Sequence, residues 1–490
     1  MEKPDLITSI YHERYTVIGE DGKPNNIVKE HHITTDAKVP KLGLMMVGLG
    51  GNNGITVTAG ILANKKHLKW ETKRGDASAN FYGSLTQCVT TKIGVRLAKE
   101  RDGKTMIQDV YAPVKNLLPM VDPTELVIGG WDISGLDMYQ ATKRAKVLEP
   151  DLIRQLKDEL SEMKPLSAVF NLSFVASNQE DRADNLKEGT NRELIDQVRE
   201  DIKKFKEING LDKVVVLWTA NTEKFYKEIS TIEELEKLID TNASLPASIL
   251  YAVASLLEHC VFLNGSPQNT LHPAIIQLAA RQGTPVGGSD FKSGQTKYKT
   301  IMGDFLIGSG MRCSSVVSYN HLGNNDGKNL SDPGTFKSKE KSKGSVLDDF
   351  IKSNSELYPP EKDKIDHSIV IKYCPYVGDS KRAIDEYTSE IFLEGHNTIV
   401  SYNICEDSLL AAPIMIDLCI LAELMTRIKI DSKPLGPVLS YLSYFFKAPL
   451  TNHKEYVINS FNRQKETLIG LLKACAGYAP DDSTLLSLNY

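Results

Sequence analysis

Residues 42–67 read LGLMMVGLGGNNGITVTAGILANKKH, and the rest of the architecture is organised around this segment. Its first part, 42–48, is a short apolar run that ends in glycine. Its last part, 55–67, carries apolar residues at helical spacing. We therefore predict a buried strand, a tight turn and a helix. The turn contains the small and amide residues Gly48, Gly50, Gly51, Asn52, Asn53 and Gly54.

The composition of this turn is typical of a dinucleotide-binding loop. Glycines allow a tight turn and let a pyrophosphate approach the backbone at the N-terminus of the helix. Asn53 occupies the last glycine position of G-x-G-x-x-G, and Gly54 follows it. A generic glycine-rich turn explains the same residues, so the motif alone leaves both interpretations open. The acid expected at the ribose is either Glu71, by spacing, or Asp132, at a strand end.

Apolar runs and helical patterns alternate along the next two hundred or so residues. The predicted strands are 124–133, 167–174 and 213–221, and the predicted helices are 135–163, 246–265 and 272–283. Continuous apolar strands that alternate with helices indicate a parallel sheet covered on both faces. We predict an α/β fold with a Rossmann-type domain.

The pattern changes after about residue 297. Alternating or β-branched segments predict strands at 313–323, 366–378, 385–393 and 397–407, with one clear helix at 344–354. We predict an inserted mixed α+β domain there. Further helices, at 407–428, 436–446 and 465–474, are expected to return to the first domain. The expected segments are an extension packing on the core (1–40), the Rossmann-type domain (41–296), the mixed-sheet domain (297–410) and a C-terminal helical segment (411–490).

Composition excludes several classes of protein. The chain has 490 residues, 41% of them apolar and 25% charged, and a net charge of -5, which argues against a general nucleic-acid binder. Seven scattered cysteines without a CxxC pair, and no secretory signal, predict a soluble cytoplasmic protein. The apolar stretch 409–425 contains Asp417 and Glu423, so we expect a buried helix and no membrane span. No zinc motif is present, but an oxygen-ligated cation near Asp290 or Asp407 stays open.

Three runs concentrate glycine, serine, asparagine and lysine, which are suited to holding a phosphate. They predict a phosphorylated small molecule at a second site, although a solvated surface loop is the plain alternative. Lys339 and Lys343 share a helix face if a helix begins early. Lys381 and Lys447 each follow an apolar run, where a lysine with a lowered pKa can transfer protons. The runs are 287–299, 319–331 and 336–343.

Nine motifs, in order between about residues 44 and 452, resemble those of the myo-inositol-1-phosphate synthase family. They are GLGGNNGIT, GGWDISG, WTANTE, GGSDFKSGQTK, SYNHLGNNDG, SKEKSK, VGDSK, ICEDSLLA and FFKAPLT. The resemblance implies an isomerase of inositol biosynthesis, upstream of phospholipid and lipid metabolism. Such an enzyme converts D-glucose 6-phosphate to 1D-myo-inositol 3-phosphate by internal NAD-dependent oxidation at C5, enolisation, aldol cyclisation and re-reduction. It also implies a homotetramer formed through the mixed-sheet domain. Whether a monovalent or divalent cation assists stays open.

The resemblance also implies roles for individual residues. The catalytic group is Lys339, Lys381, Lys447, Asp290 and Asp407. The phosphate group is expected against Ser293, Gly294, Gln295, Asn324 and Lys343. The NAD contacts are Gly48, Gly50, Gly51, Asn52, Asn53, Gly54, Asp132, Ala220, Asn221 and Asp326, so the resemblance favours Asp132 over Glu71 at the ribose.

Two other functions remain to be tested against this one. A net sugar-phosphate dehydrogenase would release NADH instead of reoxidising it. A non-catalytic sensor would bind NAD and a sugar phosphate without turnover, and the intact set of lysines argues against it.

Overall fold

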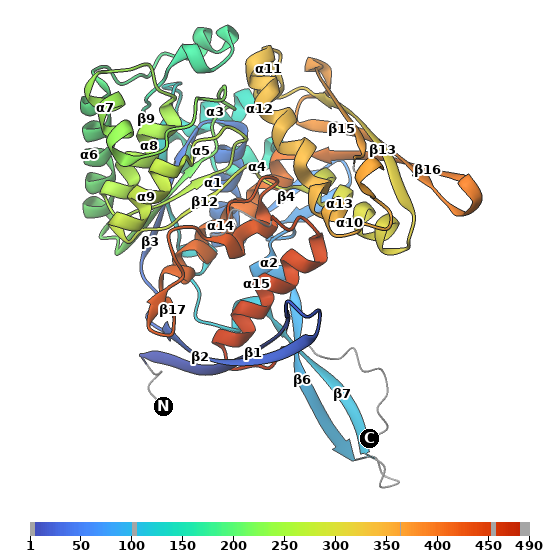
Figure 1. Cartoon of the computed structure of the whole chain (residues 1–490). Coiled ribbons are helices and arrows are strands. Elements are labelled where there is room, and N and C mark those ends of the chain that lie inside the picture. The colour runs from blue at the N-terminus through green and yellow to red at the C-terminus, as the bar shows by residue number, and fades with distance from the viewer. Residues whose placement is uncertain (1–4, 100–104, 363, 452–456, 481–490) are drawn as a thin grey trace.

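A six-stranded parallel sheet lies at the centre of the computed structural model, which describes residues 5–99, 105–362, 364–451 and 457–480 (Figure 1). Its order is β12-β11-β10-β3-β8-β9, the arrangement of a Rossmann-type domain. The strands are β3 (Leu42–Val47), β8 (Val127–Asp132), β9 (Leu166–Ser167), β10 (Lys213–Trp218), β11 (Val261–Asn264) and β12 (Val286–Gly288). The fold class expected from the sequence is confirmed.

Helices cover both faces of this sheet, which explains why its strands are continuously apolar. Alternate residues of β3 pack in opposite directions: Leu44 toward one core and Met45 toward the other. The first core is built by α1 (Asn52–Lys65), α14 (Asp407–Thr426) and α15 (Phe461–Cys475). The second is built by α6 (Asn191–Asn209), α8 (Ala247–Leu257) and α9 (Pro273–Gln282).

Helix α14 is long and apolar enough to cross a membrane by length and composition, but most of it is buried inside the protein. Its Asp417 accepts hydrogen bonds from the backbone N–H groups of Leu85 and Thr86 and from the hydroxyl of Ser84. A buried carboxylate supplied with donors in this way belongs to a protein core. The expectation of a buried helix is met.

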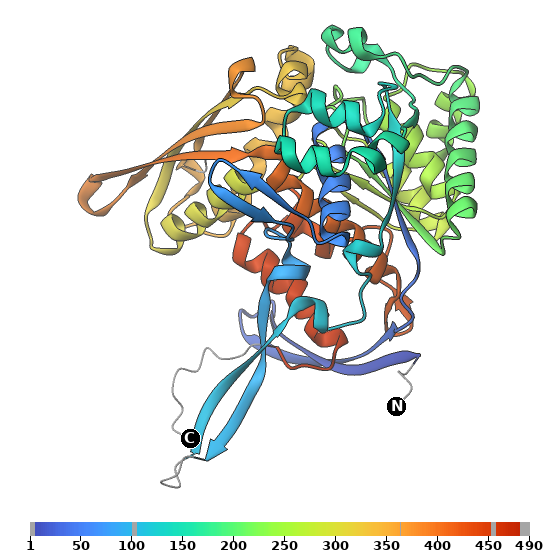
Figure 2. The same ribbon diagram turned by 180° about the vertical axis from the view of Figure 1, so that it is seen from behind.

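The second domain is a four-stranded sheet in the order β14-β13-β15-β16. Its strands are β13 (Arg312–Leu322), β14 (Asp366–Tyr373), β15 (Ser380–Glu390) and β16 (His396–Glu406). Helices α10 (Gly294–Gly308), α12 (Pro333–Gly344) and α13 (Asp348–Lys352) accompany it, and Figure 2 shows this unit in yellow and orange beside the first domain. The chain then returns to the first domain through α14.

Smaller elements surround these two units. Strands β1 (Leu6–Ile18) and β2 (Pro24–Asp36) pair along their whole length and continue into β17 (Ile428–Ile430) and β18 (Lys433–Pro434), while β6 (Thr90–Lys99) and β7 (Thr105–Pro113) form a projecting hairpin (Figure 1). The others are β4 (Lys69–Thr72), β5 (Gly75–Ser78), α2 (Leu85–Cys88), α3 (Met138–Ala145), α4 (Pro150–Gln155), α5 (Lys157–Glu162), α7 (Ile232–Asp240) and α11 (Asn325–Asn329).

Three predicted elements of the first domain differ from the structure. The predicted helix 246–265 ends at Leu257, because His259 adopts a left-handed conformation (φ 54°) and the chain turns into β11. The predicted strand 167–174 is extended only at its start, and the chain then forms short 3-10 turns. The predicted helix 135–163 is three helices, interrupted where Lys146 (φ 53°) turns left-handed.

The lysine-rich run 336–343 lies within α12, and the helix predicted at 344–354 is instead a 3-10 turn (Ser345–Leu347) followed by the short α13. Strand β15 begins at Ser380, ahead of the predicted 385, and Lys381 is therefore on a strand. The four-segment division of the chain stays a prediction, and residues 1–4 and 481–490 of its outer segments lie outside the described residues.

Candidate active site

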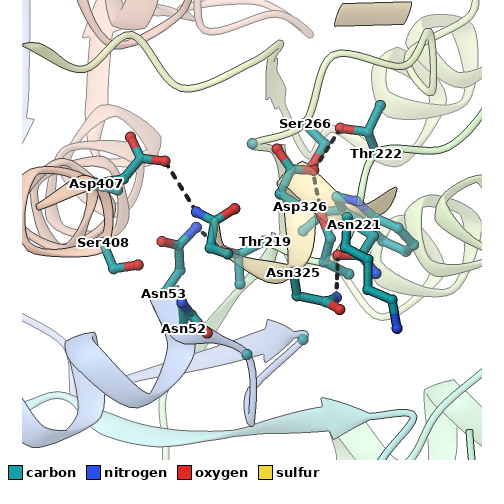
Figure 3. A pocket seen from close by; sticks show the side chains of 18 of the residues that line it. Asn52, Asn53, Thr219, Asn221, Thr222, Ser266, Asn325, Asp326, Asp407 and Ser408 are labelled. Carbon is teal, nitrogen blue, oxygen red and sulfur yellow. Dashed lines mark hydrogen bonds between the residues drawn. The ribbon is translucent and has the colours of Figure 1, made fainter. Parts of the chain in front are cut away.

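A cavity of about 420 Å³ opens at the carboxyl ends of β3, β8 and β10 and extends toward the four-stranded sheet. Ligands of open α/β sheets bind at this edge. Figure 3 shows Asn52 and Asn53, at the start of α1, near Asp407 and Ser408 of α14. The two regions that the sequence predicted separately, the glycine turn and the lysine runs, line this one cavity.

The glycine turn forms an anion cradle at the start of α1. Gly48 has φ +93°, and a Cβ there would lie 2.9 Å from the Cα of Ala220. The N-cap residue of α1 is Gly51, and no side chain caps this helix. The N–H groups of its first turn therefore remain available to an anionic group in the cavity.

The Asp132 side chain stabilises this turn through hydrogen bonds to its backbone. Its carboxylate oxygens accept hydrogen bonds from the N–H groups of Gly50 and Ser134, both at 2.9 Å, and Arg182 lies 3.8 Å away. Burial raises the pKa of Asp132, and these groups act in the opposite direction. Asp132 lines the cavity at the end of β8, where the acid of a dinucleotide site belongs. Glu71 lies on β4, is exposed and does not line the cavity.

The glycine turn, the N-terminus of α1 and Asp132 together fit a dinucleotide. The cavity continues past them along the carboxyl end of β10. Ala220, Asn221 and Asp326 all line it. The Ser266 hydroxyl donates to the carbonyl of Ala220 at 2.8 Å, and the Thr222 hydroxyl donates to Asp326 at 3.2 Å. Hydrogen bonds thus fix this wall before any ligand arrives (Figure 3).

Four lysines converge on the opposite end of the cavity: Lys339 and Lys343 from α12, Lys381 from β15, and Lys447 from the segment after Phe446. Both Lys339 and Lys447 place Nζ at 3.1 Å from Oδ1 of Asp290. Two carboxylates therefore serve the lysines, since Lys381 pairs with Asp407 at 3.5 Å and Lys343, among the described residues, donates only to the amide oxygen of Asn320, at 3.2 Å. This excess of positive charge suits an anionic ligand.

The ionisable groups of this cluster differ in the direction in which the site shifts their pKa values. Burial alone would raise the pKa of Asp290, but Lys339 and Lys447 hold it well below its usual range. Burial opposes the charge of Lys339, yet the carboxylates of Asp290, Asp326 and Asp407 together outweigh burial and raise its pKa. Burial lowers the pKa of Lys447 to about 8 even beside Asp290. Lys339 is thus a permanent cation, while Lys447 can exchange a proton near neutral pH.

The predicted phosphate contacts divide into two groups. Ser293, Asn324 and Lys343 line the cavity, and Ser293 begins α10 without a side-chain cap. Gly294 and Gln295 do not line it. The Gln295 amide donates to Asp385, at 3.1 and 3.2 Å, so its side chain is turned into the protein. Within the first turn of α10, Gln295 can offer only its backbone N–H to a phosphate.

Sequence reasoning missed one residue that joins three segments at the cavity. Asp379 accepts from the Asn52 amide at 3.2 Å, from the Ser408 hydroxyl at 2.7 Å and from the Ser408 N–H at 2.9 Å. It thereby connects the start of α1 to β15 and α14. Its only signal in the sequence was its place beside Lys381 in VGDSK. Arg182, Glu223 and Asn325 also line the cavity and were not predicted.

Gly48→Ala is expected to unfold the glycine turn and abolish NAD binding, because its Cβ would collide with the backbone of Ala220 at a left-handed residue. The expected cost is at least ~1–3 kcal/mol of stability, measured by thermal unfolding, together with loss of copurifying NAD. Gly60→Ala, on the helix α1 that follows the turn, is the control, since nothing lies within 4 Å of its added Cβ. A Gly48→Ala variant with unchanged NAD content would contradict the assignment.

The sequence and the structure are similar to those of known proteins. The sequence profile of a family described as Myo-inositol-1-phosphate synthase matches residues 42–473. Inositol-3-phosphate synthase 1 of Oryza sativa subsp. japonica is 49% identical and aligns over 93% of this chain and 90% of its own. The Rattus norvegicus protein of that name is 48% identical, over 99% and 87%. The crystal structure of inositol-3-phosphate synthase from Caenorhabditis elegans matches with a TM-score of 0.92 at 42% identity, covering 100% and 99%.

Proposed function

The chain belongs to the myo-inositol-1-phosphate synthase family and is an isomerase that converts D-glucose 6-phosphate to 1D-myo-inositol 3-phosphate; we propose that the lysine-lined cavity is where it does so. One observation carries this proposal. A nucleotide cradle and an excess of buried lysines line the same cavity. An internal redox cycle requires that the cofactor and the sugar meet in one enclosed site.

The residues of the parallel domain hold NAD. Gly48, Gly50, Gly51 and the first turn of α1 receive the pyrophosphate, and Asp132 lies at the ribose. Ala220, Asn221 and Asp326 line the nicotinamide side. When bound, NAD supplies a hydride acceptor, and later a hydride donor, for C5 of the sugar.

Lys339, Lys381 and Lys447 act on the sugar oxygens. Loss of a proton from C6 and attack of C6 on the C1 aldehyde both place negative charge on oxygen. Lys339 remains a cation because of Asp290, so it stabilises that charge in a buried site. Lys447, with a pKa of about 8, gives or takes the proton at an adjacent oxygen. Asp290 and Asp407 orient these lysines.

The phosphate anchors one end of the open-chain sugar against Lys343, Asn324, Ser293 and the N-terminus of α10. Its own oxygens lie near C6 and can serve as the base there. With the other end held by the catalytic lysines, C1 and C6 are kept close and the entropic cost of cyclisation falls.

Binding of a phosphate is expected to charge Lys343. Burial, with the ammonium groups of Lys381 and Lys447, holds the pKa of Lys343 well below its usual range. An arriving anion favours the ammonium form, so binding takes up a proton and affinity rises as pH falls. Calorimetry of inorganic phosphate in two buffers of different ionisation enthalpy counts that proton.

Lys343→Met should remove this proton uptake and weaken phosphate binding. Lys341→Met on the same helix is the control, because Lys341 is exposed. Equal proton counts for the wild-type protein and Lys343→Met would place the phosphate elsewhere.

A monovalent or divalent cation would assist next to Asp407, where Asp379 brings a second carboxylate to the same end of α14. Within the part of the chain that the structure describes, no group of three His, Cys, Asp or Glu residues is placed to hold a metal. The cation would therefore share its coordination with oxygens of the ligands. The test removes cations with a chelator and adds single cations back. Recovery of activity with one of them would show that this cation assists the reaction.

The enzyme is a cytoplasmic homotetramer in this proposal. One face of the four-stranded sheet carries an exposed row in which Tyr319, Ile384 and Tyr402 stand side by side in register. Exposed apolar residues in such a row are typical of a subunit contact. Sedimentation equilibrium measures the number of subunits.

Product analysis tests the function itself. Glucose 6-phosphate and a trace of NAD should give inositol monophosphate without accumulation of reduced nicotinamide. Reduced nicotinamide without cyclised product would make the chain a net dehydrogenase. Binding of both ligands without either product would make it a sensor.

A further inference from the structure

Lys292 lies on the loop that carries Asp290 and Ser293, yet it does not line the cavity. It is completely buried, with 0% of its surface exposed. Its Nζ donates to the carbonyl oxygen of Asn459 at 2.8 Å and to Oε1 of Gln464 at 2.9 Å. Both acceptors belong to the start of α15. The lysine thus joins the catalytic loop to the C-terminal helix.

The backbone of the same loop is bound on its other side to the segment that carries Lys447. Lys292 N–H donates to the carbonyl of Phe445 at 2.7 Å, and Lys447 N–H donates to that of Asp290 at 2.7 Å. Ser289 N–H donates to the carbonyl of Ala448 at 2.8 Å. This short antiparallel ladder sets Asp290 beside Lys447. A shift of the loop would therefore move both Asp290 and Lys447.

Acidic side chains hold the start of α15 from the opposite direction. Asp349 accepts from the Asn459 N–H at 2.9 Å, and Asp304 accepts from the Ser460 hydroxyl at 2.8 Å. The carboxylates meet N–H and O–H donors, and the Lys292 amine meets a carbonyl and an amide oxygen. The polarity of each anchor matches the group it contacts, so this turn is fixed on two sides.

Stability alone does not explain a lysine at this position. Among the described residues, no carboxylate contacts the Lys292 amine directly, and burial lowers its pKa to about 7; Lys297 adds to this effect, while Asp349 and Asp304 oppose it. Methionine would fill similar space without a desolvation cost. What lysine adds is its N–H donors, and even a neutral amine has two of them for the two acceptors.

We propose that Lys292 is a positioning residue that clamps the loop 289–293 onto the start of α15, and so holds Asp290 and the N-terminus of α10 in place. The proposal rests on the function assigned to the cavity. It makes α15 a part of the active site although no residue of α15 lines the cavity.

The test compares Lys292→Met, Gln464→Leu and the double variant in the NAD-loaded enzyme. Each single change should lower kcat on the order of 10–100-fold, because small displacements of catalytic groups have effects of this size. The double variant should be little worse than either single one, since both break the same contact. The shape of the pH profile should stay that of the wild-type enzyme, because the clamp does not transfer a proton to the sugar.

Lys473→Met is the matched control, because Lys473 is another buried lysine of α15, nine residues beyond Gln464 and hence roughly 13 Å away. Its kinetics should be near those of the wild-type protein. Wild-type kcat and KM in Lys292→Met, fully additive losses in the double variant, or loss of one limb of the pH profile would each overturn the proposal. If Lys292→Met does not fold, Gln464→Leu decides alone, and wild-type kinetics there overturns the clamp.

Binding of inorganic phosphate, measured by calorimetry, gives a readout that does not depend on turnover. The clamp variants should bind it more weakly than the wild-type protein, because α10 begins next to the clamped loop. Unchanged phosphate affinity in both clamp variants contradicts the clamp. Absence of inositol phosphate from the wild-type enzyme would instead contradict the proposed function, so the two failures are distinguishable.

Discussion

Replacing Lys339 by alanine is expected to lower kcat ~10²–10³-fold while NAD remains bound. The Lys339 side chain is mostly buried and its ammonium is held charged by Asp290 at 3.1 Å, at the end of the cavity where we propose that the sugar binds. The enolate and the aldol oxyanion would lose a fixed cation in a site that excludes water, which costs about 3–4 kcal/mol of transition-state stabilisation. The measurement is steady-state formation of inositol monophosphate, together with the NAD content of the purified protein.

Lys337→Ala is the control for this variant, since Lys337 lies on the same helix with an exposed side chain. It should retain the activity of the wild-type enzyme. Near-normal turnover in Lys339→Ala would remove Lys339 from the catalytic group. Loss of NAD from Lys339→Ala would show instead that the lysine acts at the cofactor.

Asp290→Asn is expected to destabilise the protein by about 3–5 kcal/mol and to abolish turnover. Asp290 is the shared partner of Lys339 and Lys447, and breaking a buried ion pair by removing one member leaves uncompensated charge. The loss of stability should be partly reversed by inorganic phosphate, because an anion replaces some of the missing negative charge. Chemical denaturation with and without phosphate measures both effects.

The same carboxylate predicts a pH dependence of stability. The pKa of Asp290 is lower in the folded protein than in the unfolded chain, so its stabilising contribution is complete above the unfolded pKa of about 3.9. That contribution is lost as pH falls below this value. The difference in stability between wild-type and Asp290→Asn should therefore shrink in acid. Asp366→Asn, at an exposed site, should leave stability unchanged at every pH.

The local sequence was sufficient to predict the elements that are regular and buried on both faces. The strand, turn and helix at 42–67, and the strand β10, follow from continuous apolar runs and glycine spacing. The short strand β11 was missed because VFLN directly follows a helix and is too short to show a period of its own. Only the left-handed turn at His259 separates the two, and residue type does not predict that turn.

Which of the lysines line the cavity could not be predicted from the sequence. In GGSDFKSGQTKYK, glycine and lysine suggested a phosphate loop, yet Lys292, Lys297 and Lys299 do not line the cavity. Lys297 lies 4.1 Å from the centre of the Tyr444 ring, and Lys299 donates to the Ser318 hydroxyl at 2.6 Å. Composition shows which chemistry a segment can supply, but tertiary packing decides which side chains face the ligand.

The pairing of Asp290 with two lysines depends on contacts between segments that are distant in the chain. Lys447 reaches Asp290 across 157 residues, through the ladder between the loop and the segment after Phe446. The resemblance to a known family named both residues, but only the structure shows that one carboxylate serves both ammonium groups. Asp379, which joins α1 to α14, had no pattern of its own and was found from its contacts.

The fate of the hydrogen at C5 tests most directly whether one cavity carries out an internal redox cycle. Glucose 6-phosphate deuterated at C5 should give inositol monophosphate that retains the deuterium at the same carbon, in ordinary water and with no reduced nicotinamide released. Retention would show that the hydride leaves and returns within a single enclosed site. Inositol monophosphate without deuterium, or labelled reduced nicotinamide in solution, would contradict the account.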